Sequence, residues 1–302
     1  MTGLNSRRIR ADMAPVLVAE TGTGPVELGP VLSIFDPVHV GIDEFGHPKR
    51  VPLIERNILI GGEPGSGKSG LLNAIVAHAA LSLDCKLVLL DGKRVELGQW
   101  KKCAELFVGP DIDAALSLLK RLQMMMDNRY DYLEACERRK IIPDDVFLSY
   151  LIAIDEIAYF SATIGSKQQK EDFNMLLRDL VARGRAVGII VAAATQRPSS
   201  KIIDTDLRDL FAWRFAGRCT NDSSSDIVLG HGWVNKGWSA NSISPNNPGA
   251  GLLIAENGSP ELLKVAYLDD RTCAAIAAYA ATLRAAVATG NRPLLRPVPD
   301  AA

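Results

Sequence analysis

The stretch Gly62-Glu-Pro-Gly-Ser-Gly-Lys-Ser69 decides the fold of this 302-residue chain. It fits the pattern G-x-x-x-x-G-K-[ST] at every fixed position. The apolar run Ile58-Leu-Ile60 precedes it, and a helical pattern from Lys68 to about Ser82 follows it. Glycines let backbone N–H groups turn inward around phosphate oxygens, and the N-terminus of a helix attracts anions. The sequence therefore predicts a phosphate-binding loop between a strand and a helix.

Two side chains of this loop are expected to add specific contacts. Lys68 would reach the β- and γ-phosphates of ATP, and the Ser69 hydroxyl would ligate Mg²⁺. A chance glycine-rich turn is the alternative, but the strand, loop and helix follow one another in the order that the motif requires. The residues expected to contact the nucleotide are Gly62, Glu63, Pro64, Gly65, Ser66, Gly67, Lys68, Ser69 and Gly70.

A pair of carboxylates ends the apolar run Leu151-Ile-Ala-Ile154. Beside a bound nucleotide, Asp155 would hold Mg²⁺ directly or through water. Glu156 would polarise the attacking water, because the nucleophile has to be positioned and relieved of a proton. The alternative is an ordinary strand end with solvated acids, which the phosphate-loop pattern elsewhere in the chain disfavours.

A third strand is expected to end in polar residues. The apolar run 188–194 continues into Thr195-Gln196-Arg197-Pro198. Polar residues at the carboxyl ends of parallel strands face the crevice in which ligands bind. Gln196 would there sense the γ-phosphate and report its loss to the adjoining loop. A polar turn without that role is an equally open alternative.

Apolar runs alternate with helical patterns through the middle of the chain. Further strands are expected at 86–90, 150–154, 188–194 and 211–215, and helices at 111–140, 171–183 and 272–288. Continuous apolar strands separated by helices predict an α/β fold with a mainly parallel central sheet flanked by helices. Small β-hairpins are expected in addition, around Asp43–Gly46 and around Asn257-Gly258.

The composition is that of an ordinary globular protein, with 47% hydrophobic residues, 23% charged residues and a net charge of -1. A nucleic-acid partner would therefore have to meet positive charge that is concentrated on one surface. Five widely spaced cysteines without a C-x-x-C pair argue against zinc or a disulfide framework. No secretory signal is recognised, and we expect a cytoplasmic protein that a partner would have to recruit to any membrane.

Further segments resemble the motor domain of the FtsK/SpoIIIE family. The stretch from Asp91 to Leu97 is similar to the D-x-K-x-x-E-L segment of the family, with Lys93 and Glu96 in place. Gly184-Arg-Ala-Val-Gly188 and Ala194–Pro198 resemble its most distinctive stretch, and 222–225 and 229–232 occupy its D-S-R and L-G-x-G positions. Ser224 replaces the arginine of D-S-R. The resemblance covers about residues 38–268.

This resemblance implies a RecA-like P-loop NTPase that assembles into a homo-oligomeric, hexameric ring. ATP would lie between subunits, and double-stranded DNA would pass through the pore. A neighbouring subunit would supply an arginine that stabilises charge on the γ-phosphate. Arg185 and Arg214 are the candidates, ahead of Arg183 and Arg178. For each of them the alternative is the solvated end of a helix or strand.

Two segments could present lysines to DNA. They are 161–170, with Lys167 and Lys170, and 197–208, with Lys201. The contact would be electrostatic and largely indifferent to sequence, because phosphates dominate the binding of duplex DNA. Two solvated loops are the alternative.

The resemblance also divides the chain into parts. The motor domain is expected at 38–270, after a partly ordered segment at 1–37 and before a C-terminal helix at 271–289 and a flexible tail at 290–302. No membrane-spanning region or winged-helix reader of the chromosomal translocases is recognised. In this the chain is similar to the compact transfer proteins of actinobacterial plasmids and integrative elements. A membrane-anchored or DNA-recognition partner is therefore expected.

An ATP-driven double-stranded DNA translocase, in conjugative transfer or in chromosome or plasmid movement, is the favoured function. One rival is a type VII secretion-like ATPase that translocates protein, although those usually carry several modules in tandem. A second is a coupling ATPase for single strands, although the two lysine segments lack the aromatic residues on which single-stranded bases stack. A third is a nucleotide-binding adaptor without turnover, which the intact Lys68, Asp155 and Glu156 argue against.

Overall fold

Six strands run parallel at the centre of the computed structural model, in the order β10-β5-β9-β8-β6-β7. The structure describes residues 16–21, 24–196, 198–288 and 294–296. The six strands are β5 (Ile58–Gly61), β6 (Cys85–Leu90), β7 (Leu106–Val108), β8 (Ser149–Ile154), β9 (Ile189–Thr195) and β10 (Trp213–Gly217). Every residue of β5, β8 and β9 is buried, because helices cover both faces of the sheet. The predicted mainly parallel α/β fold is confirmed.

Four antiparallel strands extend this sheet beyond β10. They are β11 (Ala250–Ala255), β12 (Glu261–Val265), β3 (Val38–Asp43) and β4 (Pro48–Val51). Both predicted hairpins are present, as β3–β4 and β11–β12. They are not separate additions, because β11 pairs with β10 and β12 pairs with β3. Ten described strands therefore form one sheet, whose outer strands, β4 and β7, have four and three residues.

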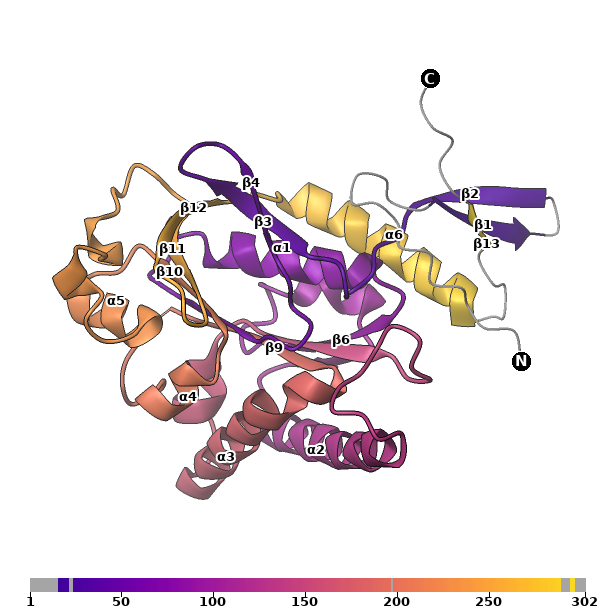
Figure 1. The fold of residues 1–302 in the computed structure, drawn as a ribbon, viewed down its shortest axis with the longest axis horizontal. Helices are drawn as coiled ribbons and strands as arrows, with labels where there is room; N and C mark the ends of the chain where they lie inside the picture. Colours follow the sequence, from indigo (N-terminus) through magenta and orange to yellow (C-terminus); the bar gives the residue numbers. More distant parts are fainter. Residues whose placement is uncertain (1–15, 22–23, 197, 289–293, 297–302) are drawn as a thin grey trace.

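Helices pack on both faces of the sheet (Figure 1). On one face lie α1 (Lys68–Leu81) and α6 (Asp270–Ala288), and Arg284 of α6 donates to the carbonyl oxygens of Ala79 and Ala80 in α1. On the other face lie α2 (Ile112–Ala135) and α3 (Lys167–Arg183). The short helices α4 (Thr205–Asp209) and α5 (Asp222–Leu229) follow β9 and β10. In the part of the chain that the structure describes, no helix is long and apolar enough to span a membrane.

Two helix ends differ from the predicted ones, one because of a side-chain cap and one because of a backbone angle. Helix α3 begins at Lys167 and not near Glu171, because Ser166 and Gln169 form a capping box. Helix α2 ends at Ala135, five residues before the predicted end, and Glu137 has a positive φ of 53°. Such a backbone angle is incompatible with a continuing right-handed helix.

A second, three-stranded sheet joins the two ends of the described chain. In it β1 (Val16–Thr21) pairs with β2 (Gly24–Pro30) and with β13 (Leu294–Arg296). These strands fall within the segments that we expected to be partly ordered or flexible. Residues 1–15, 22–23, 290–293 and 297–302 of the same predicted segments lie outside the described residues.

Candidate nucleotide site

The phosphate loop is shaped by glycines that approach other parts of the backbone. Gly67 has a φ of 97°, which favours glycine, and it is the residue before the first turn of α1. A Cβ atom on Gly67 would lie 2.6 Å from the Cα of Gly249, which precedes β11. The loop therefore needs glycine here both for its own turn and to contact a segment about 180 residues away along the chain.

Helix α1 presents an uncapped N-terminus to this loop. Side chains of Asp111, Ser166, Asp204 and Asn221 cap helices α2 to α5, each by accepting a backbone N–H of the first turn. At α1 no side chain does so. The first N–H groups of a helix have no partner within the helix and carry the positive end of its dipole. Helix α1 is therefore the described N-terminus that is best prepared to receive an anion from outside the chain.

Lys68 is directed into the loop. Its ammonium is buried and donates a hydrogen bond to the carbonyl oxygen of Glu63, at 2.7 Å. Burial lowers the pKa of Lys68 to about 8, and the carboxylates of Glu156 and Glu96 counteract part of that effect. A charged group held in a poorly solvated place gains most from an opposite charge, such as a phosphate.

Asp155 carries a buried oxygen that the fold does not satisfy. One carboxylate oxygen accepts the backbone N–H of Gly92 at 3.2 Å, whereas Oδ2 has no hydrogen-bond partner among the described residues. Burial and the nearby carboxylates of Asp91 and Glu156 raise the pKa of Asp155 to about 7. Native proteins rarely leave such an atom unpaired unless a ligand completes the site.

Glu156 ties the ends of two neighbouring strands together. It follows β8, and its two oxygens accept the hydroxyl of Thr195 at 2.8 Å and the backbone N–H of Gln196 at 2.9 Å, both at the end of β9. Oε1 also accepts the backbone N–H of Ala158 at 3.3 Å, so Oε2 is the oxygen with a second lone pair that could accept a proton from water. The structure thus brings Lys68, Asp155, Glu156 and Gln196 to one edge of the sheet, as the sequence predicted.

A cavity of about 550 Å³ lies beside Lys68 and Gln196. Most of the phosphate loop, including Pro64 and Gly70, lines it together with them. The rest of the lining consists of residues that received no role from the sequence, namely Glu96, Pro248, Gly249, Lys264, Val265, Ala266 and Tyr267. Glu96 accepts the Ser69 hydroxyl at 2.9 Å. Its place in the D-x-K-x-x-E-L segment was a signal for it, whereas the residues after β12 lie in no motif that we recognised.

The oxygen donors here fit Mg²⁺. Among the described residues, no group of three or more His, Cys, Asp or Glu side chains could hold a metal ion by itself. Mg²⁺ at nucleotide sites needs only one or two protein oxygens, because phosphates and waters supply the rest. Ser69 and the unpaired Oδ2 of Asp155 provide such oxygens, and both belong to segments that line or adjoin the cavity.

The candidate arginines do not share this edge. Arg185 lies in the turn Gly184–Val187 just before β9, whereas Thr195 ends that strand, roughly 20 Å away at about 3.3 Å per residue. Its side chain is partly exposed and faces Glu256 at 3.6 Å. Arg214 is the second residue of β10, only 13% exposed, and paired with Asp209 at 3.4 Å. Arg185 is therefore too far to serve its own loop, and Arg214 is largely covered.

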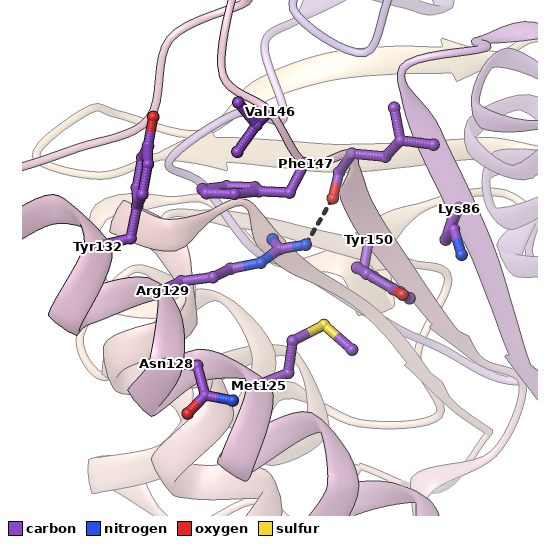
Figure 2. A pocket seen from close by; sticks show the side chains of 9 residues that line it. Lys86, Met125, Asn128, Arg129, Tyr132, Val146, Phe147 and Tyr150 are labelled. Atoms are coloured by element: carbon purple, nitrogen blue, oxygen red, sulfur yellow. Dashed lines mark hydrogen bonds between the residues drawn. The ribbon is translucent and has the colours of Figure 1, made fainter.

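A second cavity, of about 480 Å³, lies at the opposite end of the parallel strands (Figure 2). The buried guanidinium of Arg129 dominates it and donates to the carbonyl oxygens of Leu148 and Val187, each at 2.6 Å. The rings of Phe147 and Tyr150 lie 4.3 and 5.3 Å from that guanidinium. Arg129 thus fixes the start of β8 to the turn that carries Arg185.

The arrangement at the first cavity is that of P-loop ATPases, and the chain is a nucleotide-binding member of that class. A model described as the FtsK/SpoIIIE family matches residues 18–162. The resemblance to the FtsK/SpoIIIE family that was read from the motifs is therefore confirmed for this part of the chain.

Curated relatives are similar over much of this chain. The "DNA translocase FtsK" of Chlorobaculum tepidum is 30% identical over 57% of the chain and 23% of its own length. "Protein Tra" of Streptomyces lividans is 30% identical over 70% of the chain and 36% of its own length. The chain thus spans about a quarter to a third of these relatives.

Solved structures share the fold. The pCW3 conjugation coupling protein TcpA, in a monomer form with ATPγS, superposes with a TM-score of 0.71 at 21% identity, covering 89% of this chain and 81% of that chain. The cytoplasmic domain of the type VII secretion ATPase EccC from Thermomonospora curvata has a TM-score of 0.62 at 22% identity. The match covers 83% of this chain and 31% of that chain. At such identities the likeness concerns the fold alone.

Proposed function

We propose that this chain is an ATP-driven motor that moves double-stranded DNA, in conjugative transfer or in a related movement of plasmid or chromosomal DNA. The observation that carries the proposal is the site itself, in which Lys68 lines the cavity and Asp155, with its unpaired Oδ2, and Glu156 follow β8 at the same edge of the sheet. Relatives named DNA translocase FtsK and Protein Tra support DNA as the substrate.

Hydrolysis of ATP would use these side chains in separate roles. Lys68 and the N–H groups of the loop and α1 would hold the β- and γ-phosphates. Glu156 would accept a proton from a water whose oxygen attacks the γ-phosphorus, while the bond to the ADP oxygen breaks. Bound Mg²⁺, held by Ser69 and Asp155, would neutralise charge on the phosphate oxygens.

Glu156 also offers a route by which hydrolysis would move DNA. It is hydrogen-bonded to Thr195 and Gln196, which begin the segment leading to Lys201. It also precedes the turn leading to Lys167, which is 92% exposed. The two lysine segments therefore follow directly from the residues that would sense the γ-phosphate. We propose that they contact DNA phosphates inside a ring of copies.

The proposed ring is hexameric, with Arg185 of each subunit directed at the nucleotide of its neighbour. Its support is the position of Arg185 at the strand end remote from its own loop. Mixing Arg185→Ala subunits with Lys68→Ala subunits should restore part of the ATP turnover that each lacks alone. Absence of any recovery would contradict an arginine at this position acting between subunits. We further propose a cytoplasmic site of action, with any membrane recruitment left to a partner.

The decisive experiment is steady-state ATP hydrolysis without DNA, with duplex DNA, and with single-stranded DNA of matched sequence. Strong stimulation by the duplex is the expected result. Equal or greater stimulation by single strands would replace the proposal with a single-strand coupling ATPase. Turnover that no DNA changes would favour a protein-translocating machine of the type VII secretion kind.

A further inference from the structure

The lining of the nucleotide cavity contains two chemically different groups of residues, here called its two sides. The first side is the phosphate loop with Lys68, which suits the charged end of a nucleotide. The second side comprises Pro248, Val265, Ala266 and Tyr267, which offer hydrocarbon and an aromatic ring, and the charged Glu96 and Lys264 also line the cavity. An aromatic base prefers the second kind of surface, because its flat faces are poorly hydrated and stack on rings.

The second side is held in place by the antiparallel part of the sheet. The N–H of Val265 donates to the carbonyl of Gly249 at 2.9 Å, and the N–H of Ala266 donates to the carbonyl of Val40 at 2.9 Å. Gly249 in turn is the residue that Gly67 of the phosphate loop approaches. The two sides of the cavity therefore keep a fixed spacing without any ligand between them.

Lys264 adds a second support to this side. Its ammonium donates to the side-chain oxygen of Asn247 at 2.6 Å and to the carbonyl of Pro248 at 2.7 Å. These bonds join β12 to the turn before β11 and use two of the three ammonium donors. Lys264 is thus a positioning residue for Pro248.

Tyr267 is the aromatic residue on this side. It follows β12 by two residues, lines the cavity and is 83% exposed. Such a ring keeps nearly all of its surface available for a ligand. We propose that Tyr267 stacks on the base of the bound nucleotide, so that β12 and the residues after it determine base affinity while the phosphate loop determines phosphate affinity. This inference rests on nucleotide binding at the phosphate loop, as proposed above.

The test measures the contribution of the base to binding separately from that of the phosphates. Binding of ATP and of inorganic tripolyphosphate would be measured calorimetrically for wild type, Tyr267→Ala, Tyr267→Phe and Lys68→Ala. A stacked base contributes about 1–3 kcal/mol, so Tyr267→Ala should weaken ATP binding by about 5- to 150-fold. Tripolyphosphate binding should stay unchanged, and Tyr267→Phe should bind both ligands like wild type.

Each other outcome has a defined meaning. Unchanged ATP affinity in Tyr267→Ala, or an equal loss for ATP and tripolyphosphate, would overturn the stacking role. Lys68→Ala should weaken the binding of both ATP and tripolyphosphate. If it does not, the phosphate site is contradicted, whereas the role of Tyr267 is not. Phe45→Ala is the matched control, because Phe45 is also exposed, at 76%, but lies in the β3–β4 turn outside the cavity. It should bind ATP normally.

Discussion

The two cavities at opposite ends of the parallel strands are similar in size but differ in how their polar groups are satisfied. In the Arg129 cavity the buried guanidinium is hydrogen-bonded to two backbone carbonyls. In the nucleotide cavity region, Oδ2 of Asp155 and the Ser66 hydroxyl are buried without partners among the described residues. Volume therefore does not distinguish a ligand site from a structural one here, whereas unmatched polar atoms do.

The largest effect should follow from removing the charge at the nucleotide end. Lys68→Ala should reduce ATP turnover to the background of the assay, because both phosphate binding and charge stabilisation are lost. The thermal unfolding temperature should not fall, since the buried ammonium is replaced by an apolar side chain. Lys120→Ala, an exposed site on α2, is the control and should keep wild-type turnover. Normal turnover in Lys68→Ala would remove the phosphate-loop assignment.

The next largest effect should distinguish ATP hydrolysis from ATP binding at the nucleotide site. Glu156→Gln should retain ATP affinity but slow single-turnover hydrolysis by about 10²–10⁴-fold, because the amide cannot accept the proton from water. The amide oxygen can still accept either the Thr195 hydroxyl or the Gln196 N–H, so little of the strand-end geometry should change. Wild-type hydrolysis in this variant would exclude Glu156 as the base.

Substitutions of Arg129 should change the stability of the fold and leave the affinity for nucleotide unchanged. Arg129→Met leaves the carbonyls of Val187 and Leu148 without their donor, which should destabilise the fold by about 3 kcal/mol. The midpoint of thermal unfolding should fall by roughly 5 °C. Arg129→Lys can donate to one of the two carbonyls, so its unfolding midpoint should lie between those of wild type and Arg129→Met. A loss of ATP affinity without a loss of stability would show that this cavity is coupled to ligand binding.

The last effect should have the opposite sign. Asp155→Asn removes a buried charge from beside Asp91 and Glu156, so it should stabilise the protein without nucleotide or Mg²⁺. The upper limit of this gain is about 4 kcal/mol, which corresponds to a pKa raised from 3.8 to about 7. The folded-state pKa of Asp155 is raised to about 7, so ionisation destabilises the fold increasingly from about pH 4 to pH 7. The gain should therefore be full at pH 8 and vanish near pH 4. Thermal unfolding in EDTA at both values tests this.

Local motifs account for the parts of the site that could be predicted from the sequence. Lys68, Asp155 and Glu156 lie in continuous segments whose strand, loop and helix signals agree, and the structure brings them to one edge. The Ser69–Glu96 hydrogen bond and the contact between Gly67 and Gly249 could not be predicted, because they join segments that are distant in sequence. The role proposed for Tyr267 depends on such contacts.

The same limit applies to the fold and to the arginines. Both hairpins were visible as turn signals, but the pairing of β12 with β3 sets Val265 opposite Gly41, and no local pattern encodes that register. The family resemblance, which implies an arginine supplied by a neighbouring subunit, left Arg185 and Arg214 as equal candidates. Only the packing around β10 shows that Arg214 is largely covered, whereas Arg185 keeps part of its side chain exposed.

The short outer strands of the ten-stranded sheet affect whether copies of the protein aggregate at high concentration. An exposed strand edge can recruit another chain through unpaired backbone groups, which leads to aggregation. Here β4 opens with Pro48, which has no N–H, and continues with the charged Lys49 and Arg50, while β7 ends after three residues. Edges of this kind oppose sheet-to-sheet polymerisation, so copies could gather at high local concentration without nucleating fibrils.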